Sequence, residues 1–205
     1  ADLEERHRFR STASHNTVRI ARAEQNWISA AAPFRTPDNT RARLRHWRSQ
    51  PDLDEFEGEH FGYQRLPVRV VHRRGFYLDK VEAALYLVDH LLGRGQVPLE
   101  WFFHLAPGIS ALLTSGPPQR QLRRLAELQP PRSVLVSICA LKDPAGLEVP
   151  LFVFSPVALA AVVDAGWASA RYGVRERIPV LSFRAEANLP LSVLFVFDLG
   201  AARKN

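Results

Sequence analysis

Apolar and polar residues alternate along most of this chain in short runs, and turn-forming residues separate the runs. Runs of this kind are typical of β-strands in a sheet. Leu122, Leu125 and Leu128 instead have near-helical spacing, and prolines flank them on both sides, so we expect a short helix near 118–128. The remaining pattern predicts strands at residues 17–23, 41–46, 66–71, 75–79, 81–88, 99–105, 133–141, 147–154, 157–163, 178–183 and 191–199.

Short strands at regular intervals, without long helices between them, favour an all-β fold. We expect an antiparallel β-sandwich, supersandwich-like, with at most the one short helix near 118–128. The almost wholly apolar run at 191–199 fits a central strand, and the segment Gly93-Arg94-Gly95 predicts a turn between two strands of a meander. A chain of 205 residues can bury a core without cross-links, so we expect a single domain over residues 1–205.

Positive charge exceeds negative charge and is almost all arginine. The chain has 27 Lys and Arg against 21 Asp and Glu, and lysine occurs only at positions 80, 142 and 204. Guanidinium groups suit carboxylates, sulfates and phosphates, so the composition favours a polyanionic partner. A GC-rich coding sequence would produce the same excess, and both explanations stay open.

Three arginines, Arg41, Arg43 and Arg45, alternate with other residues and would share one face of a strand. This face is either a binding surface for a polyanion or an ordinary solvated face. The acidic stretch at 52–59 follows closely, and cross-strand pairing with it would neutralise the arginines.

Several common classes of site are not indicated. The single cysteine, Cys139, lies in an apolar run and is expected to be a buried free thiol. The sequence contains no phosphate-binding glycine loop, His-Glu-x-x-His, Gly-x-Ser-x-Gly or Cys-x-x-Cys motif. No apolar run approaches the ~20 residues that span a bilayer, and we expect neither a membrane nor nucleic acid as partner. Because methionine is absent and position 1 is alanine, we expect a part of a larger protein.

The densest group of polar side chains is Arg10-Ser11-Thr12-Ala13-Ser14-His15-Asn16-Thr17. Such a run is often only a polar turn. However, it resembles a signature of the heparinase II/III-like polysaccharide lyases, R-S-T-A-x-H-N-T, and further segments resemble other motifs of that family in the same order. These segments are His60-Phe61-Gly62-Tyr63, His72-Arg73-Arg74, the expected turn from Asp89 to Gly93, Phe103-His104-Leu105-Ala106-Pro107, and Gly166-Trp167 with Tyr172-Gly173. Two departures are Phe61, where the family usually has Asp, and Gln96-Val97, where it commonly has a histidine.

The resemblance implies the β-sandwich half of a lyase that cleaves acidic, uronate-containing glycans, such as glycosaminoglycans or alginate, by β-elimination. It implies that the catalytic residues lie elsewhere, most of them in an N-terminal helical domain that would be the partner of this chain. It further implies that His15 is a ligand to a structural zinc whose other ligands lie upstream. One imidazole cannot hold zinc alone, so we expect an incomplete zinc site here. A periplasmic or secreted location is expected for the parent protein.

From this resemblance we expect Arg10, Asn16, His60 and Tyr63 to bind substrate. For His60 and Tyr63 the structural alternative is a hydrogen-bonded core histidine and a buried tyrosine hydroxyl. His72 and His104 are interpreted as structural, and Trp167 as packed more often than as a platform for sugar. At the level of the whole chain, a non-catalytic module that binds anionic glycans and an interdomain scaffold remain alternatives to the lyase.

Overall fold

The computed structural model describes residues 3–114, 122, 124, 125, 128, 134–201, 203 and 204. The described strands are all joined by antiparallel pairings, so the predicted all-β antiparallel class is confirmed. The strands are β1 (Val18–Ile20), β2 (Arg43–Ser49), β3 (Leu53–His60), β4 (Val71–Asp79), β5 (Ala84–His104), β6 (Ser110–Thr114), β7 (Val134–Lys142), β8 (Leu147–Ser155), β9 (Ala160–Arg171), β10 (Val174–Asp198) and β11 (Arg203–Lys204).

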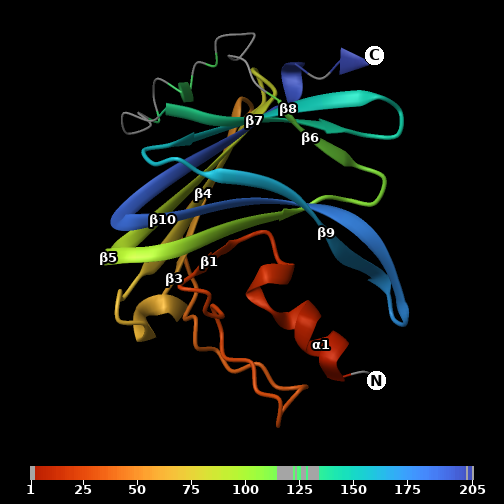
Figure 1. Cartoon of the computed structure of the whole chain (residues 1–205). Coiled ribbons are helices and arrows are strands. Elements are labelled where there is room, and N and C mark those ends of the chain that lie inside the picture. The colour runs from red at the N-terminus through yellow and green to blue at the C-terminus, as the bar shows by residue number, and fades with distance from the viewer. Residues whose placement is uncertain are drawn as a thin grey trace.

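Two long strands, β5 and β10, hold the sandwich together because each passes through both of its layers. One half of β5 pairs with β4 and with the second half of β10, while the other half pairs with β1 and the first half of β10. The first layer continues from β10 through β8 and β7 to β6, and the second continues from β10 to β9. Figure 1 shows β6, β7 and β8 in the upper layer and β1 and β9 in the lower layer.

The predicted turn at Gly93-Arg94-Gly95 is wrong, because β5 continues through it. The glycines mark the place where the strand crosses between layers, and not a chain reversal. A Cβ on Gly93 would lie 2.8 Å from the carbonyl oxygen of Val68, and Gly95 has a φ of +85°. On the neighbouring strand, the register shifts between Leu189 and Leu191, so the two strands predicted at 178–183 and 191–199 are one.

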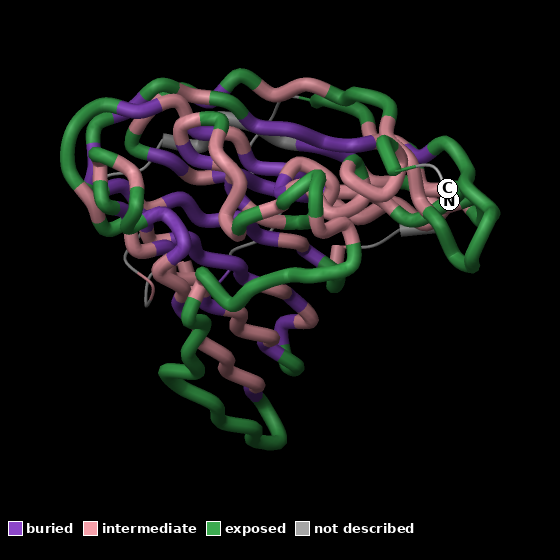
Figure 2. The backbone as a smooth tube through the Cα atoms, turned by 90° about the horizontal axis from the view of Figure 1, so that it is seen from below, coloured by how far each residue is buried: buried purple, intermediate pink, exposed green. Residues whose placement is uncertain are grey.

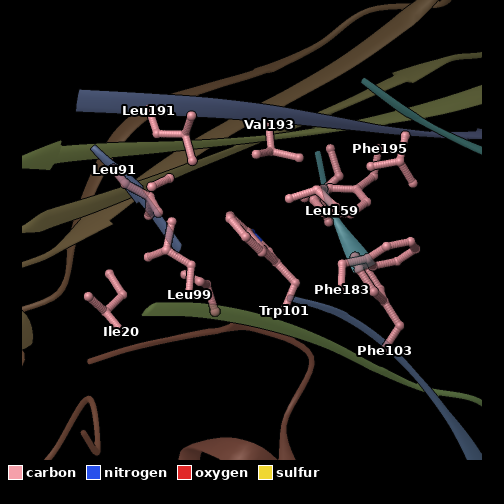
Figure 3. Packing of buried hydrophobic residues seen from close by; sticks show 14 of the residues in the cluster. Ile20, Leu91, Leu99, Trp101, Phe103, Leu159, Phe183, Leu191, Val193 and Phe195 are labelled. Atoms are coloured by element: carbon pink, nitrogen blue, oxygen red, sulfur yellow. The ribbon is translucent and has the colours of Figure 1, made fainter. Parts of the chain in front are cut away.

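The core lies between the two layers. Phe195 in the first layer contacts three rings of the second, with centroid distances of 6.3 Å to Trp101, 4.8 Å to Phe103 and 5.5 Å to Phe183. Figure 3 shows these side chains pointing toward one another from the two layers. Cys139 belongs to the same cluster, is fully buried, and is a free thiol as predicted. Burial runs along the middle of the strands, and exposure concentrates in the loops (Figure 2).

A second apolar cluster covers the outer face of the first layer. Its members on the sheet include Tyr86, Phe152 and Val196, and Leu122 packs against them with 4 % of its surface exposed. The helix predicted near 118–128 lies largely outside the described residues.

The structure has a helix that the sequence pattern did not predict, α1 (Leu3–Arg10). Glu4 and Glu5 lie in its first turn, and basic residues lie in its last turn, which complements the helix dipole. The helix contains no buried residue, so it lacks the apolar face that would have signalled it. It lies beneath the lower layer in Figure 1, where Glu5 pairs with Arg175 of β10. Three short 3-10 helices complete the described structure: η1 (Thr12–Ser14), η2 (Gly62–Arg65) and η3 (Leu199–Ala201).

None of the helices among the described residues has the length and hydropathy needed to span a lipid bilayer.

Candidate functional site

The most constrained polar group in the molecule is the carboxylate of Asp89, which has no exposed surface. Strand pairing sets Arg74 of β4 directly opposite Asp89 of β5. The guanidinium forms a bidentate pair with the carboxylate, at 2.7 Å from Nε and 2.6 Å from Nη2. The indole Nε1 of Trp101 donates to the same carboxylate at 3.0 Å, and Nε2 of His72 lies 2.7 Å from it. Asp89 is thus satisfied by three side chains.

Burial raises the pKa of Asp89, but the charge of Arg74 and the hydrogen bonds of Arg74 and His72 outweigh burial and lower this pKa overall. A buried carboxylate with such partners is stable in its ionised form. The predicted turn from Asp89 to Gly93 is wrong, since both residues lie within β5.

His60 extends this network toward the surface. The backbone N–H of Gly62 donates to Nδ1 of His60 at 3.3 Å, and Nε2 of His60 lies 3.1 Å from Nδ1 of His72. Burial and the nearby His72 lower the pKa of His60 to about 3, so its ring is neutral near pH 7. We assign the tautomers from these bonds: Nε2–H of His60 donates to His72, and Nε2–H of His72 donates to Asp89.

The network opens on a pocket of about 400 Å³ that we call the His60 pocket. Its wall holds the polar side chains of His60, His72 and Arg74 beside apolar surface from Leu44, Phe56 and Phe76, and its other lining residues are Thr17, Gln25, Ala42, Arg43, Gly58 and Glu59. A pocket with apolar walls and a few fixed polar groups is the usual form of a ligand site. Both ring nitrogens of His60 already have protein partners, so its neutral ring meets a ligand here through its carbon surface, in a fixed orientation.

Tyr63 lies beside His60, with ring centroids 5.5 Å apart, but it is fully buried. Its hydroxyl donates to the carbonyl oxygen of Val18 at 2.8 Å. Burial raises its pKa, so the hydroxyl remains protonated. This geometry supports the structural interpretation of Tyr63, because in this conformation its ring offers no surface to a ligand.

The signature residues Arg10 and Asn16 hold segments of the chain together. The guanidinium of Arg10 donates to the carbonyl oxygens of Pro33 (2.8 Å) and Arg35 (2.6 Å). The amide oxygen of Asn16 accepts from the backbone N–H of His104 at 2.7 Å. Both side chains thus already have protein partners, and any contact with substrate would be additional to these bonds.

Thr12 has the same role inside the signature. It is buried, and its hydroxyl accepts from the backbone N–H of Gln25 at 2.8 Å. The signature therefore fixes the loop at 24–36 against the sandwich. This role explains why the signature contains so many hydrogen-bonding side chains, without a ligand for each of them.

His15 lies exposed after η1. Burial and the charge of His15 lower the pKa of His104. Within the described part of the chain, no group of three His, Cys, Asp or Glu side chains could hold a metal ion. The described residues therefore do not by themselves fit a zinc site.

Arg41, Arg43 and Arg45 do not share one face of a strand, so that prediction is wrong. β2 begins at Arg43, which leaves Arg41 outside it with a φ of +48°, and the register shift between Leu44 and His46 places Arg45 at a bulge. Arg45 pairs with Glu57 at 3.2 Å and with Glu59 at 3.1 Å. The predicted cross-strand neutralisation is confirmed for this arginine.

The guanidiniums of Arg175 and Arg177 lie over the ring of Trp167, at 4.4 and 4.9 Å from its centroid. It lines a pocket of about 300 Å³ together with Arg8, Ser14 and His104. The face of an indole stabilises nearby cations, so these contacts account for the half-buried position of the ring.

Sequence reasoning found the segments that form the network but did not connect them. His72 and Arg74 were interpreted as structural, and Asp89 was placed in a turn. One signal was present, since a lone aspartate in the apolar run of residues 85–92 must find partners if the strand is buried. Only the register of β4 on β5 identifies those partners.

The fold and these contacts define an antiparallel β-sandwich domain with a polar pocket at the edge of its core. A family profile described as "Heparinase II/III-like, C-terminal" matches residues 1–189. The chain belongs to this family.

Solved structures with the same fold include a protein titled "Heparinase III-BT4657 gene product" and the heparan sulfate lyase HepC from Pedobacter heparinus. The TM-score is 0.65 and the identity 14 % for both. The first comparison covers 100 % of this chain and 26 % of the other, and the second covers 96 % and 26 %. This chain thus spans about a quarter of the length of these structures. A comparison with curated proteins finds no match.

Proposed function

We propose that this chain is the β-sandwich part of a polysaccharide lyase that cleaves acidic, uronate-containing glycans by β-elimination. The observation that carries the proposal is the family match over residues 1–189, which spans nearly the whole chain. The structural neighbours include a heparan sulfate lyase, which supports the same substrate class. In this proposal the His60 pocket contributes to substrate binding, and a helical domain elsewhere in the parent protein supplies the other wall of the cleft.

The chemistry of β-elimination explains why this chain should be only one part of the machinery. The enzyme must neutralise the uronate carboxylate, remove the C5 proton with a base, and protonate the leaving O4. Neutral His60 would contact the substrate through the carbon surface of its ring, because its two nitrogens are bonded to Gly62 and His72. The charge of Arg74 is already engaged by Asp89. We expect the acid and base that complete the reaction to come from outside the described residues. If zinc binds at His15, its remaining ligands would come from there as well. A periplasmic or secreted location fits an extracellular glycan as substrate.

The test compares the full-length protein with the 205-residue chain alone. We expect the full-length protein to release unsaturated uronate products from heparan sulfate or alginate, followed by their ultraviolet absorbance, and the chain alone to release none. Cleavage by the isolated chain, or by neither protein on any acidic glycan, would contradict the proposal.

A substitution in the full-length protein tests the role of His60. His60→Gln should raise KM for the cleaved glycan by roughly tenfold, because it removes a ring that lines the pocket and is held in place by Gly62 and His72. The matched control is His46→Gln on β2, whose side chain is 51 % exposed and lies outside the His60 pocket. Equal KM values for the two variants would exclude His60 from substrate binding.

The second candidate function is a glycan-binding module without cleavage. Exposed Trp27 and the arginines near it favour this candidate, since such groups bind acidic sugars. Binding of heparan sulfate by the full-length protein without any unsaturated product would favour the binding module over the lyase.

A further inference from the structure

A second pocket, which we call the Trp27 pocket, lies next to the His60 pocket and has no role in the network around Asp89. It measures about 410 Å³. Trp27 is 63 % exposed at its edge. The principal side chains of its lining are Trp27, Asn39, Arg41, Phe61, Gln64 and Arg65.

The loop that carries Trp27 is held in place by side chains. The amide oxygen of Asn26 accepts from the backbone N–H of Trp27 at 2.9 Å and from that of Asn39 at 3.3 Å, so it joins the two ends of the loop. The guanidinium of Arg65 donates to the carbonyl oxygens of Glu24, Gln25 and Gly62. These bonds fix the loop, so the exposure of Trp27 is built into the fold.

The groups in the Trp27 pocket match the chemistry of a sugar. An indole face packs against the apolar face of a pyranose ring, while the amides of Asn39 and Gln64 can bond its hydroxyls. The Arg41 side chain makes no hydrogen bond or ion pair with any other described residue. Arg41 and Arg65 together outweigh Asp38, the acidic residue of the lining, so the pocket carries a net positive charge. This charge favours a sugar with a carboxylate or sulfate.

The two pockets are neighbours along the same chain segments. Gln25, Arg43 and His60 line the His60 pocket, while Trp27, Arg41 and Phe61 line the Trp27 pocket. Arg43 of the first lining lies over the ring of Phe61 of the second, 5.0 Å from its centroid, so the two linings are in contact. This proximity suits a polymer with one unit in each pocket.

We propose that the Trp27 pocket is a subsite for an acidic sugar unit of the same glycan whose neighbouring unit occupies the His60 pocket. The proposal rests on the proposed function, because it assumes that the glycan is an acidic polysaccharide. In this subsite the indole of Trp27 stacks on the sugar ring, and the guanidinium of Arg41 binds the carboxylate or sulfate of the sugar.

The experiment measures the dissociation constants of heparan sulfate oligosaccharides for the full-length protein by calorimetry. Trp27→Ala should weaken the binding of a long oligosaccharide by roughly tenfold, the effect of losing one stacked ring, and leave the binding of a disaccharide unchanged. Arg41→Gln should weaken the binding of the long oligosaccharide by a similar factor. Arg41→Lys should keep most of the wild-type affinity, because the positive charge is retained. The loss of affinity in Arg41→Gln should be smaller at high salt, because salt screens the charge that the variant removes, while the loss in Trp27→Ala should not depend on salt.

The matched control is Trp47→Ala, since Trp47 is 62 % exposed but lies outside both pockets. Equal affinities of Trp27→Ala and Trp47→Ala for the long oligosaccharide would overturn the subsite, as would an equal loss for long and short ligands. If the full-length protein cleaves acidic glycans and Trp27→Ala has no effect, only the subsite fails. If it neither binds nor cleaves any of them, the proposed function fails and the subsite fails with it.

Discussion

The network around Asp89 shows how single residues keep charge inside an apolar sandwich. The carboxylate accepts from Arg74, His72 and Trp101, and these partners come from two adjacent strands. Removing one partner of such a group leaves an uncompensated buried charge, which is far more costly than the net value of the pair. His60 completes the network as a neutral ring and carries its hydrogen bonds to the pocket.

The lowered pKa of His60 makes stability depend on pH. The pKa falls from the ordinary 6.5 to about 3 on folding, so between these values the unfolded chain binds a proton that the folded chain does not. Unfolding is therefore favoured as pH decreases from about 6.5, by up to about 1.4 kcal/mol per pH unit. Asp89 adds a loss in the same direction only at lower pH, where the unfolded carboxyl begins to bind a proton.

Urea titrations at several pH values between 7 and about 4.5 measure this effect. In His60→Gln the slope of unfolding free energy against pH should be smaller than in the wild type. The pKa values of His90 and His104 are also lowered by burial, so part of the slope should remain. An unchanged slope would show that His60 is not held neutral in the folded protein.

At the scale of elements, the decisive feature is that β5 and β10 run through both layers. The apolar runs along both strands predicted extended structure correctly, but each strand was divided into two. The glycines at 93 and 95 are ambiguous in sequence, because a chain reversal and a bend with close packing use the same residue type. The bend is chosen by what packs against it, namely Val68, Val70 and Leu189.

A substitution at the bend tests this account. In Gly93→Ala the new Cβ would lie 2.8 Å from the Val68 carbonyl oxygen, so the strand must shift, and we expect a loss of about 1–3 kcal/mol in unfolding free energy. The control is Gly58→Ala within β3, where the new Cβ would lie 3.2 Å from the end of the Phe56 ring and 3.6 Å from the nearest backbone atom, the carbonyl oxygen of Arg43. Chemical denaturation of both variants measures the difference. Equal losses would mean that Gly93 is not a packing constraint.

At the scale of the whole molecule, the aromatic cluster joins the two layers into one core. Phe195 has no exposed surface and contacts rings of the opposite layer. The candidate site depends on this packing, because Trp101 belongs to the cluster and also donates to Asp89. Core and site are therefore expected to lose structure together.

Truncation of the central ring measures how much the cluster contributes. Phe195→Ala should lower the unfolding free energy by about 3–5 kcal/mol, because it leaves a cavity between the layers. Phe34→Ala serves as the control, since Phe34 is 72 % exposed and should cost less than about 1 kcal/mol. Thermal and urea unfolding of both proteins would test this, and similar values for the two would contradict the assignment of the core.

The sequence by itself determined the antiparallel all-β class, many of the extended segments, the buried Cys139 and the family resemblance, because alternation and local motifs are recorded in neighbouring residues. It did not determine β3 or β6, which lie outside the predicted strands. It did not determine α1, which lacks an apolar face, or the separation of Arg41 from Arg45, which depends on a bulge. Only the tertiary structure decided that Asp89, Arg74, His72 and His60 form one network. Partners that lie opposite each other on paired strands are set by register, and register is fixed by the packing of the whole sheet.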